Sequence, residues 1–145
     1  MRLALIVIAA VLIIPGGVSA PDDHLMFSLS DALGTQDAKA RLNQGVSFHF
    51  GSQSHGKVVQ NYGEFTSNKK TNAFNKSDKQ ACEWAFLSAM LTFQQRAQQL
   101  GGNAVINIRS YYRKNTVSSE TQYECGAGNV VAGVTFIGDV VKLEK

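Results

Sequence analysis

Residues 77–112 decide the fold, and they read SDKQACEWAFLSAMLTFQQRAQQLGGNAVINIRSYY. Ser77 is a favourable helix N-cap, and Gln80 three residues later completes a capping box. Gly101-Gly102 ends the pattern, because glycine readily adopts the left-handed conformation of a helix C-cap. The spacing therefore predicts a helix over residues 78–100, followed directly by a strand over residues 103–112.

Two apolar stripes run along the predicted helix. The larger stripe recurs at helical spacing and comprises Ala81, Cys82, Ala85, Phe86, Ala89, Phe93, Ala97 and Leu100. The second lies on the opposite side of the first three turns and comprises Trp84, Leu87 and Leu91. The later turns carry a face that we expect to be solvated, made of Gln94, Gln95, Gln98 and Gln99. We expect the early turns to be buried on two sides, by a sheet and by another part of the chain.

The strand after the helix alternates in character, so its two faces can be separated. The even positions from Ala104 to Ile108 are apolar and predict the core face. Asn107, Arg109 and Tyr111 share the other face, which is a candidate binding surface. A solvated outer face is the alternative interpretation of the same three residues.

The first twenty residues have the pattern of a secretory signal peptide. Arg2 precedes an apolar run from Leu3 to Ile14, and Val18-Ser19-Ala20 matches a small-x-small cleavage site. The run is short for a membrane span. We therefore expect residues 1–20 to be removed, residues 21–145 to form a single domain, and the protein to be periplasmic or secreted. Without Arg2 the chain has 13 basic and 11 acidic residues, a net charge of +2, which does not suggest a nucleic-acid partner.

The two cysteines of this exported chain predict a disulfide. Cys82 lies on the core stripe of the long helix, and the alternation over residues 119–125 directs Cys125 inward. A cross-link between residues 43 positions apart would stabilise the fold by about 4 kcal/mol on the chain-entropy model. A redox-active pair is the alternative, but a Cys-x-x-Cys motif is absent from the sequence.

The remaining patterns predict an α+β fold, with a mixed or antiparallel sheet packed by the long helix and by a shorter N-terminal helix. The shorter helix is expected over residues 31–42. Further strands are expected over residues 46–50, 57–62, 119–125 and 130–143. Residues 66–79 are rich in Asn, Lys, Ser and Thr and predict an irregular, basic loop, in which Ala73-Phe74 would anchor the chain to the core.

The sequence shows no catalytic motif and no cofactor motif. It lacks a phosphate-binding loop, a dinucleotide fingerprint, His-Glu-x-x-His and Gly-x-Ser-x-Gly. We therefore predict no cofactor and no catalytic residue. Metal handling through His24, His49 or His55 stays an alternative: if Pro21 is also removed, His24 becomes third from a free amine, an arrangement that chelates Cu(II) or Ni(II). A hydrolase is a further alternative, which would need Glu120 or Glu124 beside a histidine in a cleft.

Several short motifs resemble a family of small exported bacterial proteins that are often labelled "excinuclease ATPase subunit". The motifs are Lys70-Thr71-Asn72-Ala73-Phe74, Lys76-Ser77-Asp78, Ala81-Cys82-Glu83-Trp84, Leu100-Gly101-Gly102-Asn103-Ala104-Val105, Ser118-Ser119-Glu120 and Tyr123-Glu124-Cys125. The resemblance covers nearly the whole mature chain. The label does not suit this chain, because the sequence has no phosphate-binding loop.

The helix followed by Gly-Gly-Asn-Ala-Val and a strand is also similar, more distantly, to two other groups. One is the "heavy-metal-binding" domain family, which forms oligomeric rings. The other is the disulfide-bonded signalling domain of the outer-membrane Rcs stress sensor. That sensor is a lipoprotein with more cysteines, and this chain lacks both the lipid-anchor cysteine and the additional pair.

The expectation for function is an exported, non-enzymatic binding or interaction protein, whose partner is another envelope protein. Its contact surface would be the strand face of Asn107, Arg109 and Tyr111, or the Lys69–Lys79 loop. The sequence leaves the ligand and the oligomeric state open.

Overall fold

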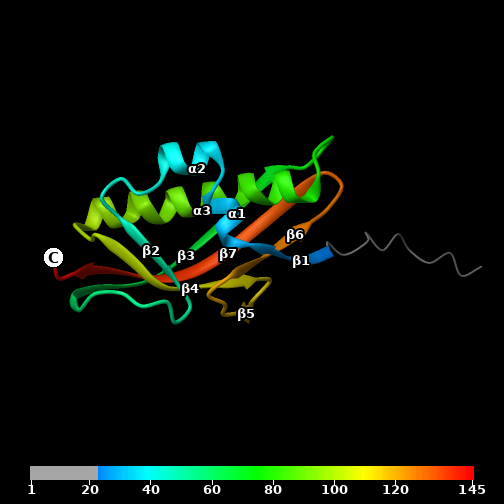
Figure 1. Ribbon diagram of the computed structural model, residues 1–145. Coiled ribbons are helices and arrows are strands. Elements are labelled where there is room, and N and C mark those ends of the chain that lie inside the picture. Colours follow the sequence, from blue (N-terminus) through cyan, green and yellow to red (C-terminus); the bar gives the residue numbers. More distant parts are fainter. Residues whose placement is uncertain (1–22) are drawn as a thin grey trace, which may run out of the picture.

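The computed structural model describes residues 23–145 (Figure 1). The predicted signal peptide lies outside this part, so it stays a prediction. The described residues form seven strands and three helices. In chain order these are β1 (Asp23–Ser28), α1 (Leu29–Leu33), α2 (Gln36–Arg41), β2 (Ser47–Phe50), β3 (Val58–Asn72), α3 (Asp78–Leu100), β4 (Ala104–Tyr112), β5 (Asn115–Val117), β6 (Gln122–Ala127) and β7 (Val131–Leu143).

The strands form one mixed sheet around β7, which confirms the predicted α+β class (Figure 1). Along one side β7 pairs antiparallel with the whole of β3. Along its other side it pairs with β4 near its C-terminal end and with β6 near its N-terminal end. β2 adds to β4 in parallel, and β1 adds to β6 antiparallel. The sheet therefore divides on one side of β7 into two arms that curl around the helical layer.

The long helix α3 has the bounds and the caps that the sequence predicts. The Ser77 hydroxyl accepts a hydrogen bond from the Gln80 amide at 3.1 Å, and Gly101 ends the helix with φ of 84°. The predicted core stripe is buried except for Leu100, which is 36% exposed at the C-terminal end. In the part of the chain that the structure describes, α3 and the other helices lack the length or the hydropathy needed to cross a bilayer.

Aromatic rings form the centre of the core between α3 and the sheet. The Phe86 ring lies 4.7 Å from Tyr123 of β6 and 5.7 Å from Phe136 of β7, measured between ring centroids. The predicted disulfide between Cys82 and Cys125 is present beside this cluster and joins the first turns of α3 to β6. Because both cysteines are fully buried, the cross-link is part of the core.

The prediction of one continuous N-terminal helix is wrong. Residues 31–42 do not form one helix, because the chain turns at Gly34 and starts α2 with Thr35 as a new N-cap. Two of the glutamines predicted to be solvated hold this segment on α3. Gln94 is buried, donates to the Arg41 carbonyl at 2.9 Å and accepts from the Gln44 amide at 3.2 Å. Gln98 donates to the Gln44 carbonyl at 3.0 Å.

The predicted faces of β4 are wrong before Asn107. Val105, which we expected on the outer face, is fully buried in the core beneath α3. Ala104 and Ile106 pack instead in a smaller cluster with Val141, Val58 and Leu143. Asn107 has φ of 49°, and the pairing with β7 shifts between Ile106 and Arg109. This bulge reverses the alternation, so that Ile108 returns to the core as predicted.

The predicted end of the strand that starts near residue 57 is also wrong. This strand does not stop near Tyr62, because β3 continues to Asn72 and takes in the first half of the expected loop. The alternation is hard to recognise in this region because its fully buried position is a serine. The Ser67 hydroxyl is buried with a hydrogen-bond partner, because it donates to the Ala89 carbonyl of α3 at 2.9 Å.

Candidate functional site

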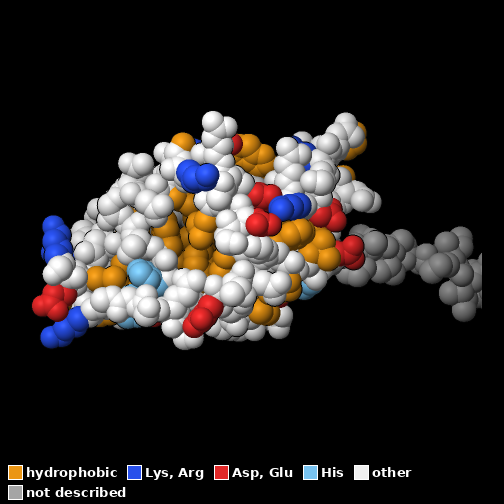
Figure 2. All heavy atoms as spheres, in the orientation of Figure 1, with side chains coloured by type: hydrophobic (Ala, Val, Ile, Leu, Met, Phe, Trp, Pro, Cys, Tyr) orange, Lys and Arg blue, Asp and Glu red, His pale blue; other side chains and the backbone are white. Residues whose placement is uncertain are grey.

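A pocket of about 290 Å³ lies between α2 and the first turns of α3. Its lining comes from both elements and consists of Thr35, Asp37, Ser77, Lys79, Gln80, Glu83, Trp84 and Leu87. In the sphere view, acidic and basic side chains gather in the region of α1 and the start of α3 (Figure 2). A concave site with an apolar wall and a few convergent polar groups is the usual form of a ligand pocket.

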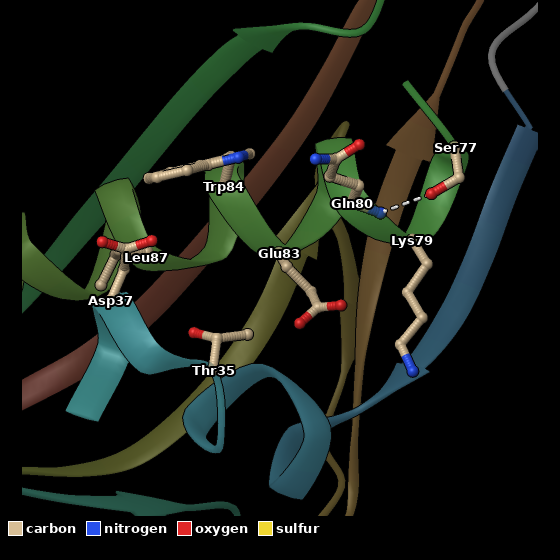
Figure 3. Close-up of a pocket in the computed structure, with 8 residues that line it drawn as sticks. All are labelled: Thr35, Asp37, Ser77, Lys79, Gln80, Glu83, Trp84 and Leu87. Carbon is tan, nitrogen blue, oxygen red and sulfur yellow. Dashed lines mark hydrogen bonds between the residues drawn. The ribbon is translucent and has the colours of Figure 1, made fainter. Parts of the chain in front are cut away.

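The second apolar stripe of α3 supplies the apolar wall of this pocket. Leu87 is buried, whereas Trp84 keeps 38% of its surface exposed, which is unusual for the largest apolar side chain. Figure 3 shows the indole lying along one flank of α3, with Asp37 of α2 beside Leu87 and with Glu83 directed toward Thr35. The pocket lining therefore combines a flat aromatic side chain with two carboxylates.

Two carboxylates and one ammonium determine the charge of the lining. Lys79 is not available as a free cation, because its Nζ forms an exposed ion pair with Asp31 of α1 at 2.9 Å. That hydrogen bond is also the main cause of the raised pKa of Lys79. Asp37 and Glu83 remain as the acidic groups of the lining, so the pocket favours a cation over an anion.

Burial raises the pKa of the Glu83 carboxyl above its usual range. Lys79 opposes this shift and lowers the pKa of Glu83, whereas the carboxylate of Asp31 raises it. A partly desolvated carboxylate interacts with an approaching charge more strongly than a fully hydrated one does. A perturbed acid in a hollow is also a recognised mark of a functional site, although ion-pair networks can produce the same shift.

A buried hydroxyl lies close to the same carboxylates. Among the described residues, the Tyr123 Oη has no hydrogen-bond partner, although the residue is fully buried. Burial raises the pKa of Tyr123, and the carboxylates of Glu83 and Asp31 raise it further. The phenol therefore stays protonated, and its O–H is a hydrogen-bond donor without a partner close to the carboxylates of Glu83 and Asp31.

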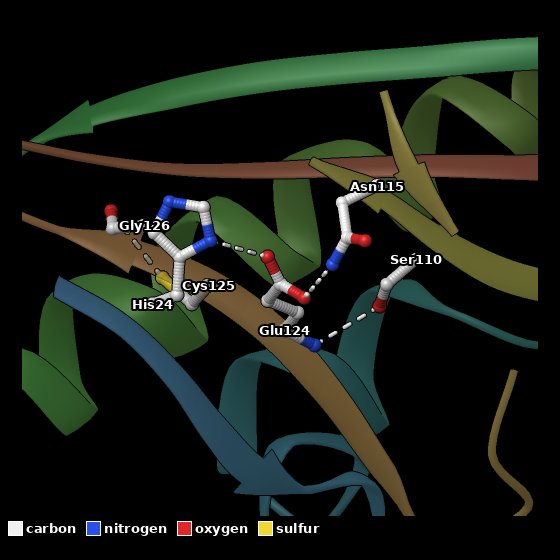
Figure 4. Close-up of polar contacts among 6 residues, drawn as sticks. All are labelled: His24, Ser110, Asn115, Glu124, Cys125 and Gly126. Atoms are coloured by element: carbon white, nitrogen blue, oxygen red, sulfur yellow. Dashed lines mark hydrogen bonds and ion pairs between the residues drawn. The ribbon is translucent and has the colours of Figure 1, made fainter. Parts of the chain in front are cut away.

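A histidine and a carboxylate meet on the other side of β6 (Figure 4). The side chain of Glu124 is buried, and its Oε1 lies 2.8 Å from Nδ1 of His24, which is exposed. Asn115 donates to the other carboxylate oxygen at 3.4 Å, and the Tyr112 ring lies edge-on to the imidazole, with its centroid 5.1 Å from that of His24. The structure thus brings together Glu124 and a histidine, as the hydrolase hypothesis requires.

The hydrolase hypothesis also requires that the histidine and the carboxylate lie in a cleft. The pocket between α2 and α3 and a shallower hollow at the end of β3 are both lined by other residues. Glu120, the other acid named for this role, accepts a hydrogen bond from the Ser52 hydroxyl and holds the β2–β3 loop. The direct effect of the His24–Glu124 contact is to fasten the first residues of β1 to β6, across 100 positions of sequence.

The predicted binding face on β4 is engaged within the molecule. The guanidinium of Arg109 donates to the Asn107 carbonyl at 2.9 Å and pairs with Glu64 of β3 at 2.7 Å. To do so it reaches across β7, where Asp139 lies opposite Glu64. Tyr111 is half-buried and is paired with Thr116 of β5. Arg109 therefore links two strands through an ion pair, and its side chain is only 18% exposed.

The three histidines of the metal hypothesis lie in two places. His49 of β2 and His55 of the β2–β3 connection lie together, with ring centroids 5.7 Å apart. His24 lies on β1, in the contact with Glu124. Within residues 23–145, no group of three or more His, Cys, Asp or Glu side chains is placed to hold a metal ion.

Comparisons with protein-family models, with curated proteins and with solved structures find no match for this chain. The resemblance to the exported bacterial family, and the more distant one to the metal-binding and sensor domains, therefore stay predictions.

Sequence reasoning did not single out the pocket as a site. The signal was present in the second stripe, where a tryptophan directly follows a glutamate near the start of a helix. We expected that stripe to be covered by another part of the chain. The structure places α2 beside it, so that Leu87 is buried and Trp84 is only partly covered.

Proposed function

We propose that this chain is an exported binding protein that holds a small organic cation in the pocket between α2 and α3. The observation that carries the proposal is a pocket lined both by the part-exposed indole of Trp84 and by two carboxylates, those of Asp37 and Glu83. A cation over an aromatic face is attracted by the ring quadrupole, and tryptophan gives the strongest attraction. Export is supported by the apolar N-terminal run and by the buried disulfide.

The size of the pocket limits the ligand. A volume of about 290 Å³ lies at the lower end of the range for small-molecule sites, so the ligand is a single ammonium or guanidinium group with a short apolar body. A lysine or arginine side chain of another envelope protein carries the same chemistry. Both sources require the same contacts with Trp84, Glu83 and Asp37.

The pocket contains a built-in reporter, because Trp84 is the single tryptophan of the sequence. Its fluorescence should change saturably when tetramethylammonium chloride or N-acetyl-lysine amide is titrated into the chain. Sodium chloride at equal ionic strength and uncharged tert-butanol should produce no saturable change. If tert-butanol binds as tightly as tetramethylammonium, the proposed cation selectivity is wrong.

Two variants locate the interaction. Glu83→Gln removes one charge at nearly constant volume and should weaken cation binding by about tenfold, which corresponds to 1.4 kcal/mol. Glu64→Gln, on β3, makes the same chemical change away from the pocket and should leave the affinity unchanged. Binding should also decrease as the pH falls through the raised pKa of Glu83, because the carboxylate is then neutralised. Equal losses in both variants would contradict the assignment.

A further inference from the structure

The end of the β3–β7 pair where β3 leads into α3 carries an exposed apolar tip. It consists of Phe74, Val130 and Val131, which are 62%, 62% and 43% exposed. In Figure 1 the connection from β3 to α3 projects beyond the body of the molecule, and Figure 2 shows hydrophobic atoms at the extremity of that projection. Large apolar side chains gathered on an exposed surface, next to polar residues, mark an interaction site.

Hydrogen bonds hold this tip in place. The Ala73 amide donates to the Val130 carbonyl at 2.7 Å and joins the two loops, while Ala73 itself is buried. The Phe74 amide donates to the Asn72 side chain at 2.8 Å, and Asn75 adopts the left-handed region with φ of 59°. Ala73 therefore anchors the loop as predicted, whereas Phe74, expected to do the same, is held outward.

The charge beside the tip is positive. Between residues 69 and 78 the chain has three lysines, Lys69, Lys70 and Lys76, against the single acid Asp78. Lys69 and Lys70 are exposed at the end of β3. Lys76 is half-buried, and its Nζ donates to the Asn72 carbonyl at 2.9 Å, which leaves two N–H groups of the ammonium for other acceptors. The second loop, residues 128–130, has no charged residue.

We propose that this tip docks on a membrane surface that bears anionic headgroups. Phe74 and Val130 enter the boundary between headgroups and acyl chains, and the lysines bind the headgroup phosphates. The lysines beside the tip complement an anionic headgroup layer, and the β3–α3 connection projects beyond the body of the molecule, so the apolar side chains at its end can reach that layer. The proposal is independent of the cation pocket, whose lining shares no residue with the tip.

Vesicle flotation tests this docking with the purified chain. Vesicles of equal parts phosphatidylglycerol and phosphatidylcholine should carry the protein, and pure phosphatidylcholine vesicles should not. High salt should weaken the binding, because each lysine near an anionic surface contributes about fivefold to the affinity. Failure to float with the mixed vesicles, or equal flotation with both, overturns the proposal.

Matched substitutions separate the tip from general surface hydrophobicity. Phe74→Ser should lower the affinity for mixed vesicles by about tenfold or more. Val59→Ser is the control, because Val59 is also an exposed apolar residue of β3, at 53%, but lies outside the hollow at the tip. If Phe74→Ser binds like the native chain, or if it changes only self-association or capture of a protein, the tip is not a lipid site. An unchanged melting temperature shows that each variant is folded.

A spectroscopic readout follows the same residue directly. In a Trp84→Phe background, Phe74→Trp should shift its emission to the blue when mixed vesicles are added, because the indole leaves water. Val59→Trp in the same background should show no shift. Cation binding to the native chain in solution can succeed or fail whatever the vesicles show, so the two proposals are tested separately.

Discussion

The disulfide between Cys82 and Cys125 provides the most quantitative test of the folding argument. We consider the double substitution of both cysteines by alanine, which removes the cross-link without burying a hydroxyl group. The bond spans 43 positions, and in the native chain it joins α3 to β6. On the chain-entropy model, opening a loop of this length lowers the free energy of unfolding by about 4 kcal/mol.

This loss is large compared with the stability of a small domain, which is about 5–15 kcal/mol. We therefore expect the variant to be marginally stable, with a much lower denaturant midpoint and a melting temperature lower by about 10–20 °C. Urea unfolding followed by circular dichroism measures the difference. The m-value should rise, because an uncrosslinked denatured chain exposes more surface.

Reduced native protein is the control for side-chain volume. Because Cys82 and Cys125 are fully buried, alanine also removes packing contacts of the two sulfurs. If loop closure dominates, the reduced native chain and the double variant should agree within about 1 kcal/mol. A total loss below about 1 kcal/mol in the double variant would refute the reasoning, because the cross-link would then constrain the denatured chain very little.

Two further predictions concern residues that the fold brings together. A methyl group added by Gly126→Ala would clash with the ring of Tyr112, so this substitution should lower the free energy of unfolding in urea by about 1–3 kcal/mol. Gly56→Ala is the control and should be nearly neutral, because the added carbon makes only ordinary contacts there. Recovery of stability when Tyr112→Leu is added to Gly126→Ala would identify the clash. Arg109→Met should cost about 1 kcal/mol near neutral pH, because it leaves Glu64 and Asp139 facing each other. Burial is the largest influence on the Asp139 carboxyl and raises its pKa, whereas Arg109 lowers it. The native state is therefore favoured when Asp139 is protonated, and this stability is lost as the pH rises through the raised pKa. Thermal melts should therefore show a smaller loss for Arg109→Met at acid pH, and a loss that is independent of pH would contradict the ionic explanation.

The long helix and the disulfide could be predicted because their signals are local. Capping residues and helical spacing are properties of adjacent positions, and they placed Ser77, Cys82 and Gly101 correctly. Alternation then directed Cys125 inward. Because the chain has only two cysteines and both point inward, each could pair only with the other. A contact across 43 positions therefore followed from two local patterns.

The end of β3 could not be predicted, because an exposed edge strand looks like a loop. In the described chain β3 pairs only with β7, and its outer edge carries Lys69 and Lys70. Charged residues of this kind protect an edge from pairing with other chains. The same composition removes the apolar alternation by which strands are recognised, and the inward Ser67 removes it further.

The faces of β4 and the contact of His24 with Glu124 depend on pairing between distant strands. Asn107 has a positive φ that few residues other than glycine adopt. A bulge at one such position exchanges the inner and outer faces for all residues of the strand that precede it. The pocket likewise needs the docking of α2 on α3, which Gln94 and Gln98 direct by hydrogen bonds to the backbone at the end of α2 and just after it. Glutamine on a helix gives no sign of such a role.

The pocket and the tip adjoin the same end of α3, and this proximity links the two proposals. Ser77, which caps the helix and lines the pocket, follows Phe74 by three residues, so at most about 11 Å of chain separates them. At physiological salt the Debye length is about 8 Å, and the potential of an anionic membrane extends over a comparable distance. Small cations are therefore concentrated where the pocket would lie when Phe74 is in the headgroup layer. A cation pocket at the membrane-facing end of a helix would thus be filled at a lower bulk concentration than the same pocket free in solution. Docking by the tip would then increase occupancy without any change in the pocket itself.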